Sequence, residues 1–159
     1  MAEKVGPLNG VRAVTCSTAQ AGTVPYMMMA DLGAEVIKVE VPGIGDGSRT
    51  AGELRGDISS FFETNNRGVK SITLNLKSEE GQKILHKLVE TADIFGQNFR
   101  PGAAEKNGFG YEELKKINPA LVYVSVSGYG QLGPHSDLPG TDAVGQALGG
   151  ISEAYAGPG

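Results

Sequence analysis

An amide, an aromatic ring and a guanidinium group stand side by side at Asn98, Phe99 and Arg100, followed by Pro101 and Gly102. An adenine ring with a nearby phosphate would suit this trio, because the aromatic ring can stack on the base and arginine binds phosphate bidentately. A surface loop with a solvated arginine explains the same residues equally well. A nucleotide-binding loop is therefore one of two interpretations.

Two lysines could add phosphate contacts to such a loop. Lys77 ends a predicted strand, and Lys106 lies on the helix predicted after Pro101. Lys77 is equally well explained as a surface charge beside Glu79 and Glu80. The carboxylates of these two residues would repel an anion at that helix start.

Two further polar residues stand where predicted helices begin. Gln20 lies in the turn 19–22 between a strand and a helix, where its side chain and free helix amides could meet an anion. An exposed glutamine in a tight turn is the favoured alternative. Asp142 begins the last predicted helix, and an N-cap or first-turn acid is its default interpretation.

The sequence lacks several widespread catalytic motifs. Residues 43–47, Gly-Ile-Gly-Asp-Gly, follow a strand but do not form the G-x-G-x-x-G of a dinucleotide site. There is also no G-x-x-x-x-G-K-[ST] phosphate loop, no G-x-S-x-G elbow and no H-E-x-x-H pair. Nucleotide hydrolysis, serine hydrolysis and zinc chemistry lose their usual support, and we expect no metal site.

Strands and helices alternate along the chain. The hydrophobic patterns predict strands over residues 11–16, 34–40, 70–76, 93–98 and 121–127. They predict helices over residues 22–32, 78–92 and 111–117, a short helix from Pro101 and another from about Asp142. Residues 42–57 and 128–140 are predicted as loops.

Repeated strand-helix-strand units of this spacing predict an α/β fold with a doubly wound, mostly parallel sheet and helices on both faces. The continuous apolar run over residues 121–127 is typical of a strand buried in a parallel sheet. Ligands bind such sheets at the carboxyl ends of the strands. The loops after the predicted strands are therefore the places to look for chemistry.

Charge and cysteine content narrow the class of protein. The 159 residues carry 14 basic and 18 acidic side chains, a net charge of −4, which excludes the basic footprint of a nucleic-acid-binding protein. No apolar run is long enough to span a membrane, and the first residues lack the apolar core of a signal peptide. With Cys16 as the single cysteine, we expect a cytoplasmic protein.

Six segments, taken in order, resemble the class III coenzyme A transferase family, which includes formyl-CoA transferase, carnitine CoA-transferase and α-methylacyl-CoA racemase. The segments are residues 7–12, 19–22, 30–40, 70–77, 98–102 and 127–131. The resemblance implies a Rossmann-like large domain and a homodimer. It also implies an enzyme that moves CoA between an acyl-CoA and a carboxylic acid, through mixed anhydrides and an aspartyl-CoA thioester, with CoA as substrate and no permanently bound cofactor.

The resemblance also implies roles for individual residues. Gln20 would support the acyl intermediate near the thioester, and Asp142 would stand close to the reacting carbonyl. The nucleotide and pantetheine arm of CoA would lie in a groove lined by Leu74, Lys77, Asn98, Phe99, Arg100 and Lys106.

Two positions depart from relatives within the family. Some members hold the adenosine end of CoA with an arginine where this chain has Val41. The racemase branch carries a histidine for proton transfer where this chain has Thr141, which favours transfer over racemisation.

Members of the family are much longer than this chain, and the resemblance places the nucleophilic aspartate beyond Gly159. Residues 1–159 are expected to form the N-terminal part of the large CoA-binding domain, without the small domain and the returning C-terminal segment. Such a fragment is expected to be inactive alone. An acyl-CoA racemase or isomerase, and a stand-alone CoA-binding module or split-enzyme subunit, are the alternative functions.

Overall fold

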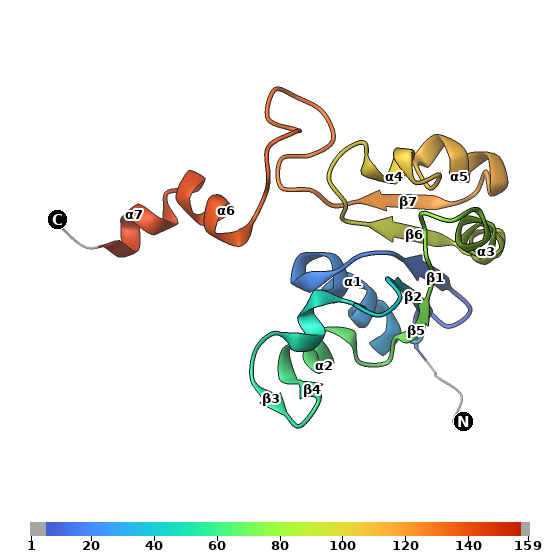
Figure 1. Cartoon of the computed structure of the whole chain (residues 1–159), viewed down its shortest axis with the longest axis horizontal. Coiled ribbons are helices and arrows are strands. Elements are labelled where there is room, and N and C mark those ends of the chain that lie inside the picture. Colours follow the sequence, from blue (N-terminus) through green and yellow to red (C-terminus); the bar gives the residue numbers. More distant parts are fainter. Residues whose placement is uncertain (1–5, 157–159) are drawn as a thin grey trace. The chain divides into compact units, whose positions relative to one another are not determined.

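The computed structural model describes residues 6–156, and its main sheet has five strands, all parallel to their neighbours (Figure 1). In spatial order they are β5 (Lys70–Thr73), β2 (Glu35–Glu40), β1 (Arg12–Thr15), β6 (Ile94–Gln97) and β7 (Val122–Ser125). The predicted α/β class and parallel sheet are confirmed. The chain divides into two compact units, Met1–Val126 and Ser127–Gly159.

Strand β1 lies between β2 and β6. Ala13 of β1 is paired with Val36 of β2 on one side and with Ile94 of β6 on the other. The chain builds outward from β1 through β2 to β5, then returns to the far side of β1 to add β6 and β7. The strand order therefore reverses between β1 and β6, and such a reversal is where open α/β sheets bind ligands.

Helices α1 (Ala19–Asp31) and α2 (Ser60–Asn66) lie on one face of this sheet. Tyr26 and Ala30 of α1 pack on Ala13, Ala34 and Val36, and the small alanines let the helix approach the strands closely. Helix α1 begins three residues before the predicted start at 22. The spacing of apolar residues does not predict the first turn of α1, because polar contacts from Asn98 and Asp46 hold this turn in place.

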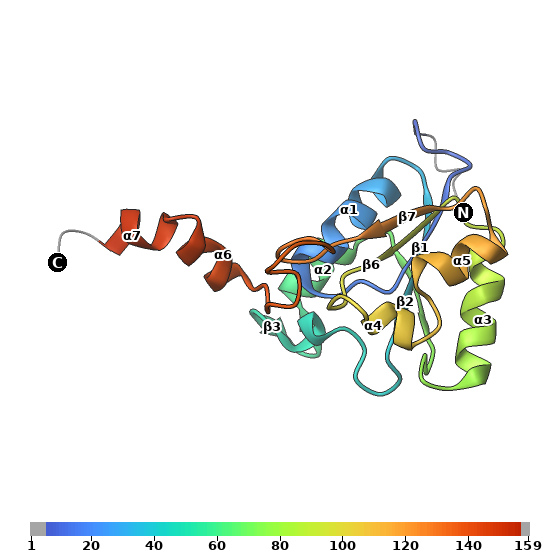
Figure 2. The same ribbon diagram turned by 90° about the horizontal axis from the view of Figure 1, so that it is seen from above.

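Helices α3 (Glu79–Val89), α4 (Ala103–Lys106) and α5 (Tyr111–Ile117) lie on the other face, and Figure 2 shows α1 and α3 on opposite sides of the strands. The predicted N-cap of α3 is confirmed, because the Ser78 Oγ accepts a hydrogen bond from Gly81 N at 3.2 Å. Leu85 and Leu114 pack with Phe95 of β6 in the core beneath these helices. The doubly wound arrangement is thus confirmed.

The segment predicted as a loop over residues 42–57 contains regular structure. It holds a 3₁₀ turn, η1 (Gly47–Thr50), and one strand of a small antiparallel hairpin formed by β3 (Leu54–Arg55) and β4 (Ile58–Ser59). Helix α2 follows directly and is missing from the sequence prediction. Its signal was a serine cap, since the Ser59 Oγ accepts a hydrogen bond from Phe62 N at 3.1 Å.

Strand β7 is less buried than its apolar sequence predicts. It pairs only with β6 within the described residues and forms an edge of the sheet. Val122 is 57% exposed, and the other residues of β7 are half-buried. The prediction of a fully buried strand is therefore wrong for residues 6–156.

The second unit contains a loop and two short helices. Gly128 and Gly140 are in contact at the two ends of the loop that joins them. A Cβ on either residue would lie 2.4 Å from the Cα of the other. The helix predicted from Asp142 is divided into α6 (Asp142–Leu148) and α7 (Ile151–Ala156), and Gly150 between them has a φ of +75°. The predicted domain 1–159 includes residues 1–5 and 157–159, which lie outside the described range. No helix within residues 6–156 is long and apolar enough to cross a membrane.

Candidate functional site

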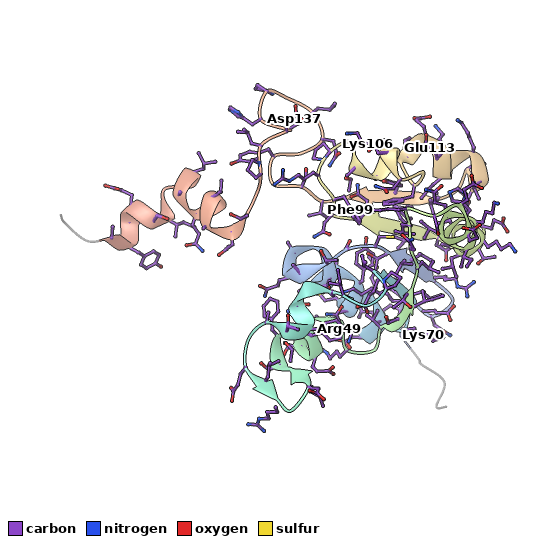
Figure 3. The ribbon with its side chains drawn as sticks, viewed as in Figure 1. Arg49, Lys70, Phe99, Lys106, Glu113 and Asp137 are labelled. Atoms are coloured by element: carbon purple, nitrogen blue, oxygen red, sulfur yellow. The ribbon has the colours of Figure 1, made fainter. Side chains whose placement is uncertain are left out.

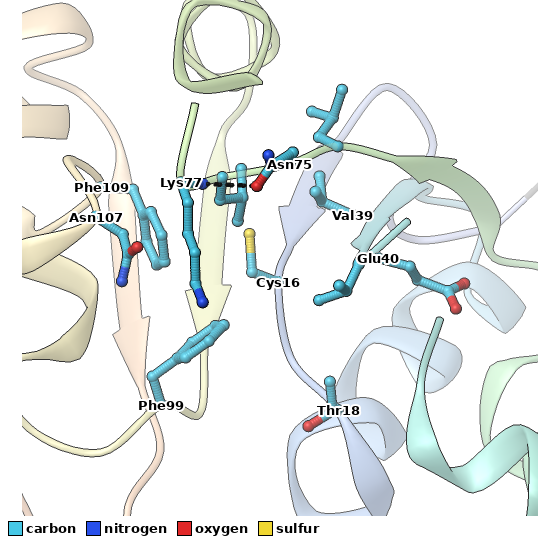
Figure 4. A pocket seen from close by; sticks show the side chains of 12 residues that line it. Cys16, Thr18, Val39, Glu40, Asn75, Lys77, Phe99, Asn107 and Phe109 are labelled. Atoms are coloured by element: carbon cyan, nitrogen blue, oxygen red, sulfur yellow. Dashed lines mark hydrogen bonds between the residues drawn. The ribbon is translucent and has the colours of Figure 1, made fainter. Parts of the chain in front are cut away.

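A cavity of about 300 Å³ opens at the carboxyl ends of β1, β2 and β5, beside the loop that follows β6 (Figure 4). It is lined by Cys16, Thr18, Val39, Glu40, Val41, Leu74, Asn75, Leu76, Lys77, Phe99, Asn107 and Phe109. This is the edge of the sheet at which the sequence predicts a ligand site. The cavity reaches the reversal of strand order through the segments that follow β1 and β6.

Most of the cavity wall is apolar, and one cation reaches into it. Val39, Leu74 and Phe99 supply aliphatic and aromatic surface. Figure 4 shows the Lys77 side chain extending into the cavity toward Phe99, while the Glu40 carboxylate points away from Lys77. Such a wall suits a flat apolar ring system with an anionic group beside it.

Three of the six residues predicted to line a CoA groove border this cavity: Leu74, Lys77 and Phe99. Arg100 and Lys106 are exposed and do not line it. Figure 3 places Phe99 on the loop after β6 and Lys106 on α4. The structure thus brings together part of the predicted set.

Asn98, also predicted to line the groove, holds the turn between β1 and α1. Its Oδ1 accepts a hydrogen bond from Thr18 N at 2.9 Å, and its Nδ2 donates to Thr18 O at 2.8 Å. Gly22 lies against the same amide, and a Cβ there would meet the Asn98 Nδ2 at 2.6 Å. Asn98 therefore joins the loop after β6 to the first turn of α1.

Gln20 is exposed in the first turn of α1, directly after the turn that Asn98 holds. It does not line the cavity. The sequence predicts Gln20 in a turn before the helix, whereas the structure places it inside α1, as the second residue of the helix.

Asp142 belongs to the second unit, where it is the first residue of α6. Thr141 is the N-cap, with its Oγ1 accepting from Val144 N at 3.4 Å. The Asp142 Oδ2 accepts a hydrogen bond from Gln146 Nε2 at 2.6 Å. Asp142 is therefore a first-turn acid rather than the cap.

Several residues of the cavity wall were not singled out by the sequence. Asn107 and Phe109 come from a turn after α4, where Gly108 has a φ of +74°. The Asn-Gly-Phe-Gly run is a turn signal that could have indicated this contribution. Cys16 lies in the wall, and burial raises the pKa of its thiol, so Cys16 stays protonated and is a poor nucleophile.

A buried ion pair behind the cavity was also missed. Lys38 and Asp46 are each 1% exposed, and the Lys38 ammonium pairs with the Asp46 carboxylate. Lys38 Nζ also donates to Asn66 Oδ1 at 2.7 Å. The Asp46 Oδ1 accepts hydrogen bonds from the backbone N and the Oγ of Ser48, at 2.9 and 2.8 Å. The signal was a lysine inside an otherwise apolar strand, since a buried lysine needs a partner.

A second ion pair lies at the end of the same strand. Arg49 donates from Nε and Nη2 to the two carboxylate oxygens of Glu40, at 2.8 and 2.6 Å. Ser71 Oγ donates to the same carboxylate at 2.6 Å, and the Arg49 guanidinium lies 3.8 Å from the centre of the Phe62 ring. Strand β2 is thereby joined to the turn at Asp46 and Arg49 by two ion pairs.

These buried carboxylates make the stability of the chain sensitive to acid. Burial alone would raise the pKa of Asp46, but hydrogen bonds from Lys38 and Ser48 outweigh burial and hold the pKa below its ordinary value of 3.8. Burial also works to raise the pKa of Glu40, but Arg49 and Ser71 hold that pKa below 4.5. A carboxyl with a lowered pKa stabilises the folded state above its unfolded-state pKa, and this contribution is lost as the pH falls through the folded-state value.

We therefore expect the free energy of unfolding, measured in urea, to be steady above about pH 5 and to fall steeply below about pH 4. Glu40→Gln should lower stability at pH 7, because it weakens the pair with Arg49. It should also make the fall in acid shallower, because one titrating group is gone. Parallel curves for the two proteins would contradict a linkage to Glu40.

No group of three or more His, Cys, Asp and Glu side chains in residues 6–156 is placed to hold a metal ion. The chemistry available at the cavity is binding through apolar surface, a lysine and amide groups.

Comparison with known proteins gives one consistent result. The sequence profile of CoA-transferase family III matches residues 8–159. Acetyl-CoA:oxalate CoA-transferase from Acetobacter aceti is 44% identical over 153 residues, which are 96% of this chain and 39% of that protein. Human succinyl-CoA:glutarate CoA-transferase is 43% identical over 148 residues, which are 92% of this chain and 34% of that protein.

A solved structure agrees with these relatives. The crystal structure of a CAIB/BAIF family protein from Brucella suis superposes with a TM-score of 0.87 at 40% identity, covering 92% of this chain and 40% of that one. The chain thus spans no more than about two fifths of these three proteins.

Proposed function

The chain belongs to CoA-transferase family III, and we propose on this premise that the whole protein moves coenzyme A from an acyl-CoA to a carboxylic acid. The observation that carries the proposal is the cavity at the carboxyl edge of the sheet. Leu74, Lys77 and Phe99 of its wall come from the segments after β5 and β6 that the family resemblance assigns to CoA binding. The relatives named above as CoA-transferases support the reaction type.

We propose that the cavity takes the nucleotide end of CoA. Phe99 offers a ring face to the adenine, Leu74 offers apolar contact, and the Lys77 ammonium pairs with a phosphate. Asn98 supports this site indirectly through the turn after β1. The exposed Arg100 and Lys106 are proposed to meet the outer phosphates, and Asp142 to stand near the reacting carbonyl.

The proposed reaction exchanges bonds without an oxidant, reductant or metal. An enzyme aspartate attacks the acyl-CoA carbonyl and expels the CoA thiolate, leaving a mixed anhydride. The thiolate then attacks the aspartyl carbonyl, which releases the first acid and forms an aspartyl-CoA thioester. The acceptor carboxylate then attacks the aspartyl-CoA thioester, expels the CoA thiolate and forms a second mixed anhydride. The thiolate attacks the acceptor's carbonyl in this anhydride, which gives the new acyl-CoA and frees the aspartate. Gln20 is proposed to support the acyl intermediate.

The reacting aspartate is expected beyond Gly159, so exchange is proposed for the whole protein and not for these 159 residues alone. We propose that residues 1–159 form the N-terminal part of its large CoA-binding domain. The resemblance further leads us to propose a cytoplasmic homodimer with CoA as substrate and without a permanently bound cofactor.

Binding of CoA to this chain tests the proposal directly, by titration calorimetry. We expect saturable binding, and we expect Lys77→Ala to weaken it about tenfold through the loss of one charge-assisted contact to phosphate. Lys83→Ala is the matched control, because Lys83 carries the same charge on an exposed part of α3 and does not line the cavity. An absence of CoA binding, or equal affinities for the Lys77→Ala variant and the parent, would contradict the proposed site.

A further inference from the structure

Ala19 has an unusual backbone conformation at the start of α1. Its φ is +57°, and it is the one residue other than glycine with a positive φ within residues 6–156. The left-handed region brings the Cβ of an L-residue close to backbone atoms and costs free energy, so surrounding contacts must hold it. Gln20 follows directly, and the direction in which its side chain leaves the turn depends on this backbone.

Two side chains from distant segments hold the turn. Asn98 makes hydrogen bonds with both the N and the O of Thr18. The Asp46 Oδ1 accepts a hydrogen bond from Ala19 N at 3.3 Å. The residue with the strained backbone is therefore bound by a carboxylate that lies 27 positions later in the sequence.

Asp46 is itself fixed from several directions. Its carboxylate is paired with Lys38 and accepts from Ser48, and its backbone N donates to Glu40 Oε2 at 2.8 Å. Glu40 is in turn paired with Arg49. Because Asp46 and its partners Lys38, Ser48 and Glu40 are buried, Asp46 has little freedom to move and can act as a fixed anchor for Ala19.

We propose that Asp46 is a positioning residue for Gln20: by binding Ala19 N, it keeps the turn in the left-handed conformation that aims Gln20 at the reacting thioester. This inference rests on the proposed function for the role of Gln20. Asp46 itself touches no substrate. Its effect is to hold Ala19 in a backbone conformation that an L-alanine would not otherwise adopt.

The test separates the hydrogen bond to Ala19 from the buried charge. Lys38→Met is placed in both proteins, so that no buried ammonium is left unpaired. One protein also carries Asp46→Asn, whose Oδ1 can still accept from Ala19 N, and the other carries Asp46→Ala, which cannot. Glu35→Gln is the control, because it removes ion pairs from the opposite end of β2.

In this chain, we expect amide hydrogen exchange followed by NMR to show faster exchange of Ala19 N–H in the alanine variant than in the asparagine variant. In the whole protein, we expect kcat for CoA transfer to be about tenfold lower in the alanine variant than in the asparagine variant. The KM values of the two variants for acyl-CoA should agree within about twofold, because a displaced group lowers turnover more than binding. Glu35→Gln should leave both readouts unchanged.

A second-site change distinguishes positioning from general damage. Adding Ala19→Gly to the alanine variant should restore much of the lost kcat, because glycine adopts a positive φ without strain. Equal kcat values for the alanine and asparagine variants, or no recovery with glycine, would overturn the positioning role alone. An unsubstituted whole protein that binds CoA but transfers none would overturn the proposed function, and this role of Asp46 with it.

Discussion

Lys38→Met should lower the free energy of unfolding of this chain by about 3–5 kcal/mol in urea titration, because it leaves the Asp46 carboxylate buried without its cation. Methionine fills a volume close to that of lysine, so a cavity contributes little. Asn66 also loses its hydrogen bond from Lys38, which adds to the cost.

A double-mutant cycle shows whether the unpaired charge is the cause. Lys38→Met with Asp46→Asn should be more stable than Lys38→Met alone, because the neutral amide needs no cation. Breaking the exposed pair between Arg67 and Asp31 with Asp31→Asn should cost less than about 1 kcal/mol, since both side chains are solvated. If Lys38→Met and Asp31→Asn lowered the free energy of unfolding by similar amounts, burial would not make the loss of an ion-pair partner more costly.

Gly96→Ala should lower the free energy of unfolding by about 3 kcal/mol or more, because the added methyl group has no room. Its Cβ would lie 1.3 Å from the Tyr26 hydroxyl oxygen and 2.4 Å from the ring carbon that carries it. Tyr26 is 3% exposed and packed between α1 and the sheet, so its ring cannot swing away.

Gly47→Ala is the matched control for this substitution. Gly47 has open space where its Cβ would be and no positive φ, so the same change should alter stability by less than about 0.5 kcal/mol. The measurement is again the urea midpoint and slope for both variants. A Gly96→Ala protein as stable as the Gly47→Ala protein would show that α1 and β6 can move apart.

The sheet and its order of layers follow well from the sequence. Residues 36–39 hold three β-branched apolar side chains around Lys38, and the helix with Ser78 as its cap has a clear apolar stripe. These signals are local and predict the individual elements. The preference for right-handed crossovers between parallel strands then predicts how the helices cover the two faces of the sheet. Helix α2 was not predicted because it is short and its cap, Ser59, follows closely on a glycine-rich stretch.

The site was harder to predict, because it depends on contacts between distant segments. Lys77 and Phe99 follow strands, and their side-chain types marked them as candidates, although only the family resemblance favoured a binding role over a surface one. Asn98 carries the same kind of signal, yet its amide is used to hold Thr18. The pairing of Lys38 with Asp46 depends on how the chain turns back after β2, which no local pattern reports.

The central place of β1 also has a consequence during synthesis. The segments that form β1, β2, β5, α1 and α2 all precede residue 74, so three of the five strands can assemble early on the ribosome. The other edge of β1 must wait for β6, whose Gly96 lies 81 positions after its contact Thr15. Closing so long a loop is slow, and an open strand edge invites pairing with other chains. Until β6 docks on β1, the nascent chain therefore carries an open strand edge that favours aggregation.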